Sequence, residues 1–282
     1  MLFYWHTDSR LALSAPRGRK TNWINFMDGY ADLFGHQIFY RVIGDLKADK
    51  PTIIMLHEGL GSSSQWRSLP ELLHQQTESP VLLYDRSGYG RSSSGPQVYE
   101  TDFMHHEGQS VLPALVEQLN ITKPILLGHS DGASIALIAS GSKAVEASAI
   151  ITIAAHIFVE IECIAGIEEI KQNRDSILSP LSKYHQDSAS TFDRWARIWL
   201  DPEFARFDIR SLLSKIECPV LALQGDHDDY GTTEMVDGIT RETPNAVGHI
   251  IQDCGHMAHQ DQPEVIISCV KQFLASQQAT CT

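Results

Sequence analysis

Short apolar runs recur along the chain and alternate with amphipathic stretches. Such runs, rich in Ile, Val and Leu, are typical of strands that a parallel sheet buries on both faces. An earlier segment, 37–43, alternates apolar and polar residues after a turn at Gly35, and with 30–34 it predicts an antiparallel hairpin at a sheet edge. The further predicted strands lie at 52–56, the run best suited to burial on both faces, and at 81–84, 124–127, 149–153, 220–224 and 248–251.

Helical spacing of apolar residues fills most of the intervals between these strands. Val111, Leu112, Leu115 and Leu119, for example, fall on one face of a helix. Strands that alternate with helices in this way predict an α/β fold with a doubly wound, mostly parallel sheet. The expected helices lie at 66–75, 107–119, from 132 onward, 233–241 and 264–275.

The alternation stops after 149–153, the sixth predicted strand. From Phe158 to Leu213 the pattern is helical, and we interpret it as a helical cap over the carboxyl edge of the sheet. The predicted organisation is an N-terminal arm at 1–24, an α/β core formed by 25–157 and 214–282, and a cap at 158–213. Two apolar stripes support the cap: Ile161, Ile164, Ile167 and Ile170 form one, and Phe192, Trp195, Ala196 and Trp199 form the other.

Composition narrows the class of protein. An apolar fraction of 43% in 282 residues provides ample material for a core. A net charge of −13 disfavours nucleic acid and anionic membranes as partners, because both bind clustered Lys and Arg. No apolar window has the length of a signal-peptide core or a membrane span, and the odd number of scattered cysteines argues against a disulfide framework. We therefore expect a cytoplasmic monomer or homodimer with no membrane or nucleic-acid partner.

One turn carries candidate chemistry. The run at 124–127 leads into Gly128-His-Ser-Asp-Gly132, in which a glycine stands two residues to either side of Ser130. This G-x-S-x-G pattern is typical of a nucleophile elbow, a sharp strand-to-helix turn that exposes a serine hydroxyl above a sheet. The backbone N–H of Asp131 would then face the place where an oxyanion forms.

An activated serine needs a base, and the base needs a carboxylate that orients it. Both residue types follow Ser130 along the chain, each just beyond the carboxyl end of a predicted strand, where catalytic groups gather in open α/β sheets. The candidates are Asp226, Asp228 and Asp229 after 220–224, and His256 and His259 after 248–251. With His227, these residues also allow a metal site, but no histidine pair has the spacing of ligands on a helix, so we expect no metal.

Several further motifs accompany these residues. They are His57-x-Gly-Leu-Gly-Ser-Ser63 with Trp66, Asp85-x-x-Gly-x-Gly-x-Ser92, Gly225-x-x-Asp228, and Gly255-His256 with Gln262-Pro-Glu264. Together with the elbow they resemble the α/β-hydrolase superfamily over about residues 28–276, and within it the capped, esterase-like serine enzymes. Groups with a similar pattern include the biotin-pathway carboxylesterase, the menaquinone-pathway lyases and the valacyclovir hydrolase.

The resemblance implies a role for each matched residue. Ser130 would be the nucleophile, His256 the general base, and Asp228, three residues after the glycine, the acid. Asp226 and Asp229 are second choices for the acid, and His259 is the competing base. The oxyanion would be held by the backbone N–H groups of Gly59 and Asp131. No cofactor is implied.

Glu58 departs from the family pattern, which usually has His-Gly where this chain has His57-Glu58. A carboxylate beside a developing negative charge is unfavourable, so we expect Glu58 to point away and to be neutralised by a partner. The side chain of Asp131 has two explanations: an interaction with the helix dipole, or binding of a substrate ammonium, as in the valacyclovir hydrolase that Ser-Asp-Gly resembles. The candidate pocket residues are Glu58, His129, His156, Trp195 and Trp199.

The predicted function is a serine hydrolase that cleaves a small-molecule carboxylic ester through an acyl-enzyme intermediate. The same fold hosts other functions. The alternatives are a carbon–carbon bond hydrolase, a cofactor-free lyase, an aminoacyl-ester hydrolase and a ligand-binding receptor.

Overall fold

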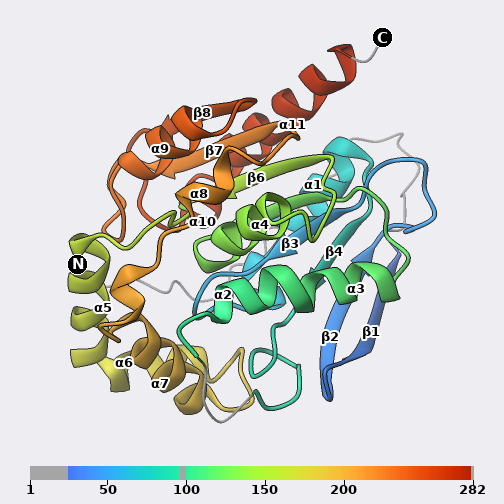
Figure 1. Ribbon diagram of the computed structural model, residues 1–282. Coiled ribbons are helices and arrows are strands. Elements are labelled where there is room, and N and C mark those ends of the chain that lie inside the picture. Colours follow the sequence, from blue (N-terminus) through green and yellow to red (C-terminus); the bar gives the residue numbers. More distant parts are fainter. Residues whose placement is uncertain (1–24, 96–99, 281–282) are drawn as a thin grey trace, which may run out of the picture.

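Eight strands form one sheet in the computed structural model, which describes residues 25–95 and 100–280 (Figure 1). Their order across the sheet is β1-β2-β4-β3-β5-β6-β7-β8. β1 and β2 form an antiparallel hairpin, β2 runs antiparallel to β4, and the other neighbours are parallel. The strands are β1 (Phe26–Leu33), β2 (His36–Ile43), β3 (Ile53–Leu56), β4 (Val81–Tyr84), β5 (Ile125–His129), β6 (Ala149–Ile153), β7 (Val220–Gly225) and β8 (Ala246–Ile251).

Helices cover both faces of this sheet, which confirms the doubly wound, mostly parallel α/β fold (Figure 1). Every residue of β3, β4, β5 and β6 is buried, which explains why these strands are continuous apolar runs. On one face lie α1 (Leu69–Thr77) and α11 (Pro263–Thr280). The other face carries α2 (Phe103–His106), α3 (Leu112–Gln118), α4 (Asp131–Gly141), α8 (Arg210–Leu213) and α9 (Glu234–Glu242).

Two predicted helices differ in detail from the observed ones. The helix expected at 66–75 is a short 3-10 turn, η1 (Ser63–Trp66), followed by α1, whose first turn holds Pro70. The helix expected at 107–119 begins earlier, with α2, and passes through a π-helical turn, η2 (Glu107–Val111), before α3. Because Pro113 has no N–H to donate, an unbroken α-helix is unfavourable at this point.

The stretch between β6 and β7 is largely helical, as expected, and lies beside one end of the sheet (Figure 1). Non-helical connections interrupt it at 182–187 and 200–203, and Phe158 pairs with Asp208 in an isolated bridge. Before α8 the stretch contains α5 (Ile161–Gln172), α6 (Arg174–Leu181), α7 (Ser188–Trp199) and η3 (Phe204–Arg206).

The predicted apolar stripe on α5 is wrong at its first residue. Ile161 is 79% exposed, whereas Cys163 and Ile167 are buried. A repeat of three residues drifts around a helix that has 3.6 residues per turn, so Ile161 and Ile170 lie on roughly opposite sides. The buried face of α5 therefore follows Cys163 and Ile167.

Across residues 25–95 and 100–280, no helix combines the length and the apolar character needed to cross a bilayer. The cysteines of this part of the chain, Cys163, Cys218, Cys254 and Cys269, are unpaired. The predicted N-terminal arm at 1–24 lies outside the described residues.

The turn from β5 into α4 packs tightly against the end of β3. A Cβ added to Gly132 would lie 2.1 Å from the carbonyl oxygen of Leu56, and one added to Gly128 would lie 2.3 Å from the carbonyl oxygen of Gly132. Between the two glycines, Ser130 has φ of 51° and ψ of −120°, a conformation that non-glycine residues rarely adopt. The two glycines of the motif are therefore required by backbone contact alone.

Gly132→Ala should lower the free energy of unfolding by about 1–3 kcal/mol, because the methyl group must displace backbone rather than a flexible side chain. Denaturant unfolding measures the change. Gly231→Ala is the control, since its nearest neighbour would be 3.4 Å from the new Cβ. Equal stabilities of the two variants would contradict the packing argument.

Candidate active site

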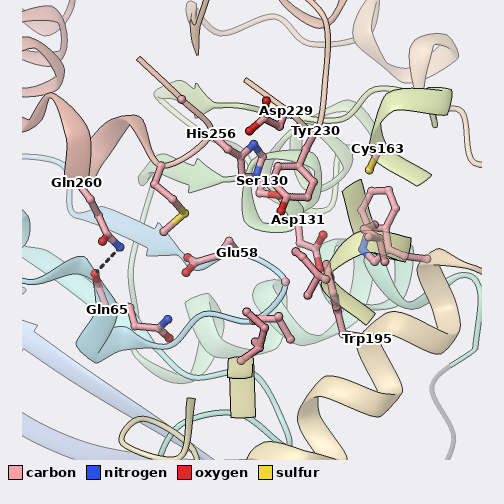
Figure 2. A pocket seen from close by; sticks show the side chains of 18 of the residues that line it. Glu58, Gln65, Ser130, Asp131, Cys163, Trp195, Asp229, Tyr230, His256 and Gln260 are labelled. Carbon is pink, nitrogen blue, oxygen red and sulfur yellow. Dashed lines mark hydrogen bonds between the residues drawn. The ribbon is translucent and has the colours of Figure 1, made fainter. Parts of the chain in front are cut away.

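A cavity of about 380 Å³ lies between the carboxyl ends of the central strands and helices α5 to α7. Figure 2 shows Ser130, Asp131 and His256 grouped together in its wall, with Glu58, Gln65 and Gln260 to one side and Cys163 and Trp195 to the other. The cavity therefore joins a mostly polar end to an apolar end, and the predicted nucleophile and base stand between them.

Ser130 is placed by backbone contacts on both sides of the elbow. Its N–H donates to the carbonyl oxygen of Ile153 at 2.9 Å, and its carbonyl oxygen accepts from Ala133 and Ser134 at 2.9 and 3.1 Å. Asp131 is the first residue of α4, where a helix leaves its N–H groups without intrahelical partners. An oxyanion formed at Ser130 would meet this N–H and the positive end of the helix dipole.

His256 pairs with Asp228. Its Nδ1 lies 2.9 and 3.0 Å from the two carboxylate oxygens. The carboxylate, with a side chain only 1% exposed, also accepts from the backbone N–H of Tyr230 at 2.9 Å and from the Gln224 amide at 3.3 Å. These contacts fix the proton on Nδ1 of His256 and leave Nε2 for a second partner.

Asp228 and His256 shift each other's pKa values in opposite directions. Burial opposes the charged form of each group, but their mutual attraction and hydrogen bond outweigh it. As a result the pKa of Asp228 lies below its ordinary value, and the pKa of His256 lies above its ordinary value.

The second choices for the acid and the base occupy other environments. The Asp226 carboxylate accepts from the backbone N–H of Cys254 at 3.1 Å, and Asp229 is exposed at the cavity. His259 is buried against Trp66, with ring centroids 4.7 Å apart, and burial lowers its pKa well below the ordinary value. The geometry thus pairs His256 with Asp228.

A buried arginine holds the loop that carries Gly59. Arg86 is 1% exposed and donates from Nη1 to the carbonyl oxygen of His57 at 2.8 Å and from Nη2 to that of Glu58 at 2.9 Å. The same Nη2 lies 3.7 Å from Oδ2 of Asp131. One guanidinium therefore links the loop after β3 to the start of α4, the two elements that carry the predicted oxyanion donors.

The side chain of Asp131 is buried beside Arg86. Its side chain is 1% exposed; burial raises its pKa to about 6, although Arg86 acts in the opposite direction. Arg86 gives the Asp131 carboxyl a charged neighbour at 3.7 Å, but Asp131 also lines the cavity, so both explanations of its side chain stay predictions.

Glu58 only partly meets expectation. It does not point away: its carboxylate faces the cavity (Figure 2). It does have a partner, because Oε2 lies 3.4 Å from Nδ1 of the buried His129. The neighbouring glycine makes this conformation possible, since a Cβ on Gly61 would lie 2.4 Å from the Glu58 carboxyl carbon.

Three of the other predicted pocket residues line the cavity and one does not. Trp195 and Trp199 of α7 line it, and Trp195 contacts the loop so closely that a Cβ on Gly59 would lie 2.1 Å from its indole nitrogen. His156 also lines it; burial lowers its pKa to about 3, so its imidazole is neutral. His129 is the exception: it is fully buried behind the cavity wall, since its ring packs into the protein rather than toward a ligand.

Several residues at the site carry no signal in the sequence. Arg86 lies inside a recognised motif, but nothing in the motif indicates that its charge is buried. Cys163 and Ile167 belong to a helix whose register against the cavity depends on packing. The lining residues not anticipated include Gln65, Arg67, Cys163, Ile167, Tyr230 and Gln260.

A mostly parallel eight-stranded sheet with a strained serine turn after its fifth strand defines the class of α/β hydrolases. Residues 53–268 match the model of the Alpha/beta hydrolase family, and the chain belongs to that family. Family membership supports an enzyme with hydrolase activity.

Curated relatives of two kinds are similar to this chain. A proline iminopeptidase of Lactobacillus helveticus is 31% identical over 118 residues, which cover 41% of this chain and 38% of the relative. The chain thus aligns with well under half the length of the first such relatives. An sn-1-specific diacylglycerol lipase of Danio rerio is 27% identical over 264 residues, 82% of this chain and 80% of the relative.

Solved structures confirm the fold. The proline iminopeptidase of Mycobacterium smegmatis superposes with a TM-score of 0.69 at 16% identity, over 91% of this chain and all of that one. MGS-M2, an α/β hydrolase from a deep-sea metagenome library, gives a TM-score of 0.73 at 20% identity, over 88% of this chain and 97% of that one. Identities this low show a shared fold and leave the predicted subgroups as predictions.

Asp228→Asn should lower kcat by about 10³- to 10⁴-fold, because the amide no longer fixes the tautomer of His256 or stabilises its imidazolium. Asp229→Asn, at an exposed position on the same loop, is the matched control and should change kcat by less than about twofold. Ester turnover by purified variants measures both. The reverse ranking would refute the assignment of Asp228.

Proposed function

We propose that the protein is a serine hydrolase that cleaves a small-molecule carboxylic ester through an acyl-enzyme intermediate. The observation that carries the proposal is the contact of His256 with both oxygens of Asp228 beside a serine held in a strained turn of the same cavity. A base oriented by a carboxylate, in the same cavity as a strained serine turn, supports nucleophilic catalysis by serine.

The proposed steps follow from the proton positions. The hydrogen bond to Asp228 keeps a proton on Nδ1 of His256. Nε2 of His256 therefore accepts the Ser130 proton as Oγ attacks the substrate carbonyl. The tetrahedral oxyanion is stabilised by the N–H groups of Gly59 and Asp131. His256 then donates the proton to the leaving alcohol, and water activated by the same imidazole hydrolyses the acyl-enzyme.

The cavity supports an ester with one apolar part. Apolar side chains from the 158–213 segment form one end, and we assign this segment as the cap and 25–157 with 214–282 as the core. A volume of about 380 Å³ suits a small molecule. The apolar lining residues are Cys163, Ile167, Ile170, Ile177, Leu181, Trp195 and Trp199.

The names of the relatives leave a choice between an amide and an ester substrate. Some are called proline iminopeptidases and others sn-1-specific diacylglycerol lipases, so amide and ester substrates both occur among them. We favour an ester because apolar side chains form one whole end of the cavity. A cytoplasmic location and a monomeric or homodimeric state, expected from composition, belong to the same proposal.

Purified protein should hydrolyse p-nitrophenyl acetate or butyrate with a pre-steady-state burst of p-nitrophenol, because acylation releases the alcohol before water attacks. Ser130→Ala should abolish the burst and lower turnover by at least about 10³-fold. Prolyl p-nitroanilide serves as the comparison substrate. Faster turnover of the anilide than of the esters would contradict the ester assignment, and full activity of Ser130→Ala would contradict the proposal altogether.

The pH dependence of kcat/KM tests the pairing independently. Only neutral His256 accepts the Ser130 proton, so activity should be lost as pH falls through the pKa of His256. Because Asp228 raises that pKa, the midpoint should lie above the ordinary value of 6.5. In Asp228→Asn the residual activity should show its midpoint at lower pH. An unshifted midpoint would exclude Asp228 as the partner.

A further inference from the structure

His129, the residue before Ser130, makes a contact that the mechanism does not use. Its Nε2 lies 2.9 Å from the backbone carbonyl oxygen of His256. A carbonyl oxygen only accepts, so Nε2 carries a proton. The residue next to the nucleophile is therefore hydrogen-bonded to the main chain of the base.

The second nitrogen of His129 determines how many protons the site holds. Nδ1 lies 3.4 Å from Oε2 of Glu58. Since Nε2 is already protonated, a hydrogen bond here requires one more proton, carried either by Nδ1 or by the carboxyl. In both cases Glu58 and His129 together have no net charge.

The histidines around Glu58 favour its carboxylate form. Burial would raise the pKa of Glu58, but the hydrogen bond and charge of His129, with smaller contributions from His259 and His57, hold it well below the ordinary value. The contact with His129 explains how the Glu58 carboxylate is tolerated one residue before the proposed oxyanion donor Gly59.

We propose that Glu58 and His129 act as a positioning pair, in which Glu58 orients the His129 imidazole and His129 fixes the His256 backbone relative to Ser130. The proposal rests on the proposed function of Ser130 and His256. The pair connects three segments that meet only in the folded chain: the loop after β3, the end of β5 and the loop after β8.

The surroundings support a positioning role rather than contact with substrate for His129. The ring is fully buried, with Trp66 at 6.4 Å and His259 at 4.6 Å between ring centroids. Gly61 leaves room for the Glu58 carboxyl to fold back over its own loop. The His129 ring is thus enclosed, and a change in its hydrogen bonds reaches the substrate only through its neighbours.

The test is a double-mutant cycle with kcat and KM for p-nitrophenyl acetate and the melting temperature of each variant. Glu58→Ala and His129→Leu remove the hydrogen bonds and should each lower kcat about 10- to 100-fold with KM within about twofold, because catalysis is sensitive to small displacements. The double variant should be no slower than the slower single variant, since both act through one unit.

Conservative variants provide the rescue. Gln at position 129 (His129→Gln) can donate to the His256 carbonyl, and Gln at position 58 (Glu58→Gln) can donate to a neutral His129, so both should stay within about threefold of the parent kcat. Glu117→Gln and His106→Gln, both exposed and distant in sequence from the residues that line the cavity, are the matched controls. If either truncated variant does not fold, Glu58→Asp and His129→Asn replace the truncations in the cycle, because their shorter side chains lose the same hydrogen bonds and should lower kcat in the same way.

Three results would overturn the pairing: multiplicative losses in the double variant, a rise in KM at unchanged kcat for Glu58→Ala, or parental kinetics for all variants. The second result would instead make Glu58 a substrate contact. Ser130→Ala, assayed alongside, separates a failure of the positioning pair from a failure of the proposed function. An inactive Ser130→Ala with parental His129→Leu defeats only the pair, whereas an active Ser130→Ala defeats the proposed function.

Discussion

The close approach of the β5–α4 turn to the end of β3 is the constraint on which the site depends. Only a residue without a Cβ fits at position 132, against the carbonyl of Leu56. This contact brings the start of α4 beside the loop that follows β3, so that Ser130, the N–H of Asp131 and Gly59 share one corner of the cavity. The strained φ of Ser130 follows from the same packing.

Around that corner, buried charges are present in compensating sets. Arg86 lies beside Asp131 and binds two loop carbonyls, Glu58 lies beside His129, and Asp228 pairs with His256. Removing one member of a buried pair leaves an uncompensated charge, which typically costs about 3–5 kcal/mol. The loops of the cavity are consequently connected through side chains as well as through the sheet, and a change in one pair is transmitted to the next.

Most of the fold and the candidate nucleophile, base and acid could be predicted from the sequence, because apolar periodicity and glycine-dependent turns are local signals. The strands of the parallel sheet and the pairing candidates Asp228 and His256 were accessible in this way, although only the last residue of β8 is buried. Other features depend on contacts between distant segments. The inward orientation of Glu58 requires a histidine 71 residues later, and the burial of Arg86 requires carbonyls from another strand's loop. Ile161 is a case in which a local pattern gave the wrong prediction, because a three-residue repeat drifts off the buried face of its helix.

The central claim is that Ser130 is a nucleophile activated by His256. Labelling with a fluorophosphonate, followed by peptide mass spectrometry, tests it most directly, because only an activated serine reacts with this probe. We predict one adduct per chain on the peptide that contains Ser130, and loss of labelling in His256→Ala that remains folded. Labelling at another residue, or none at Ser130 in folded protein, would contradict the account.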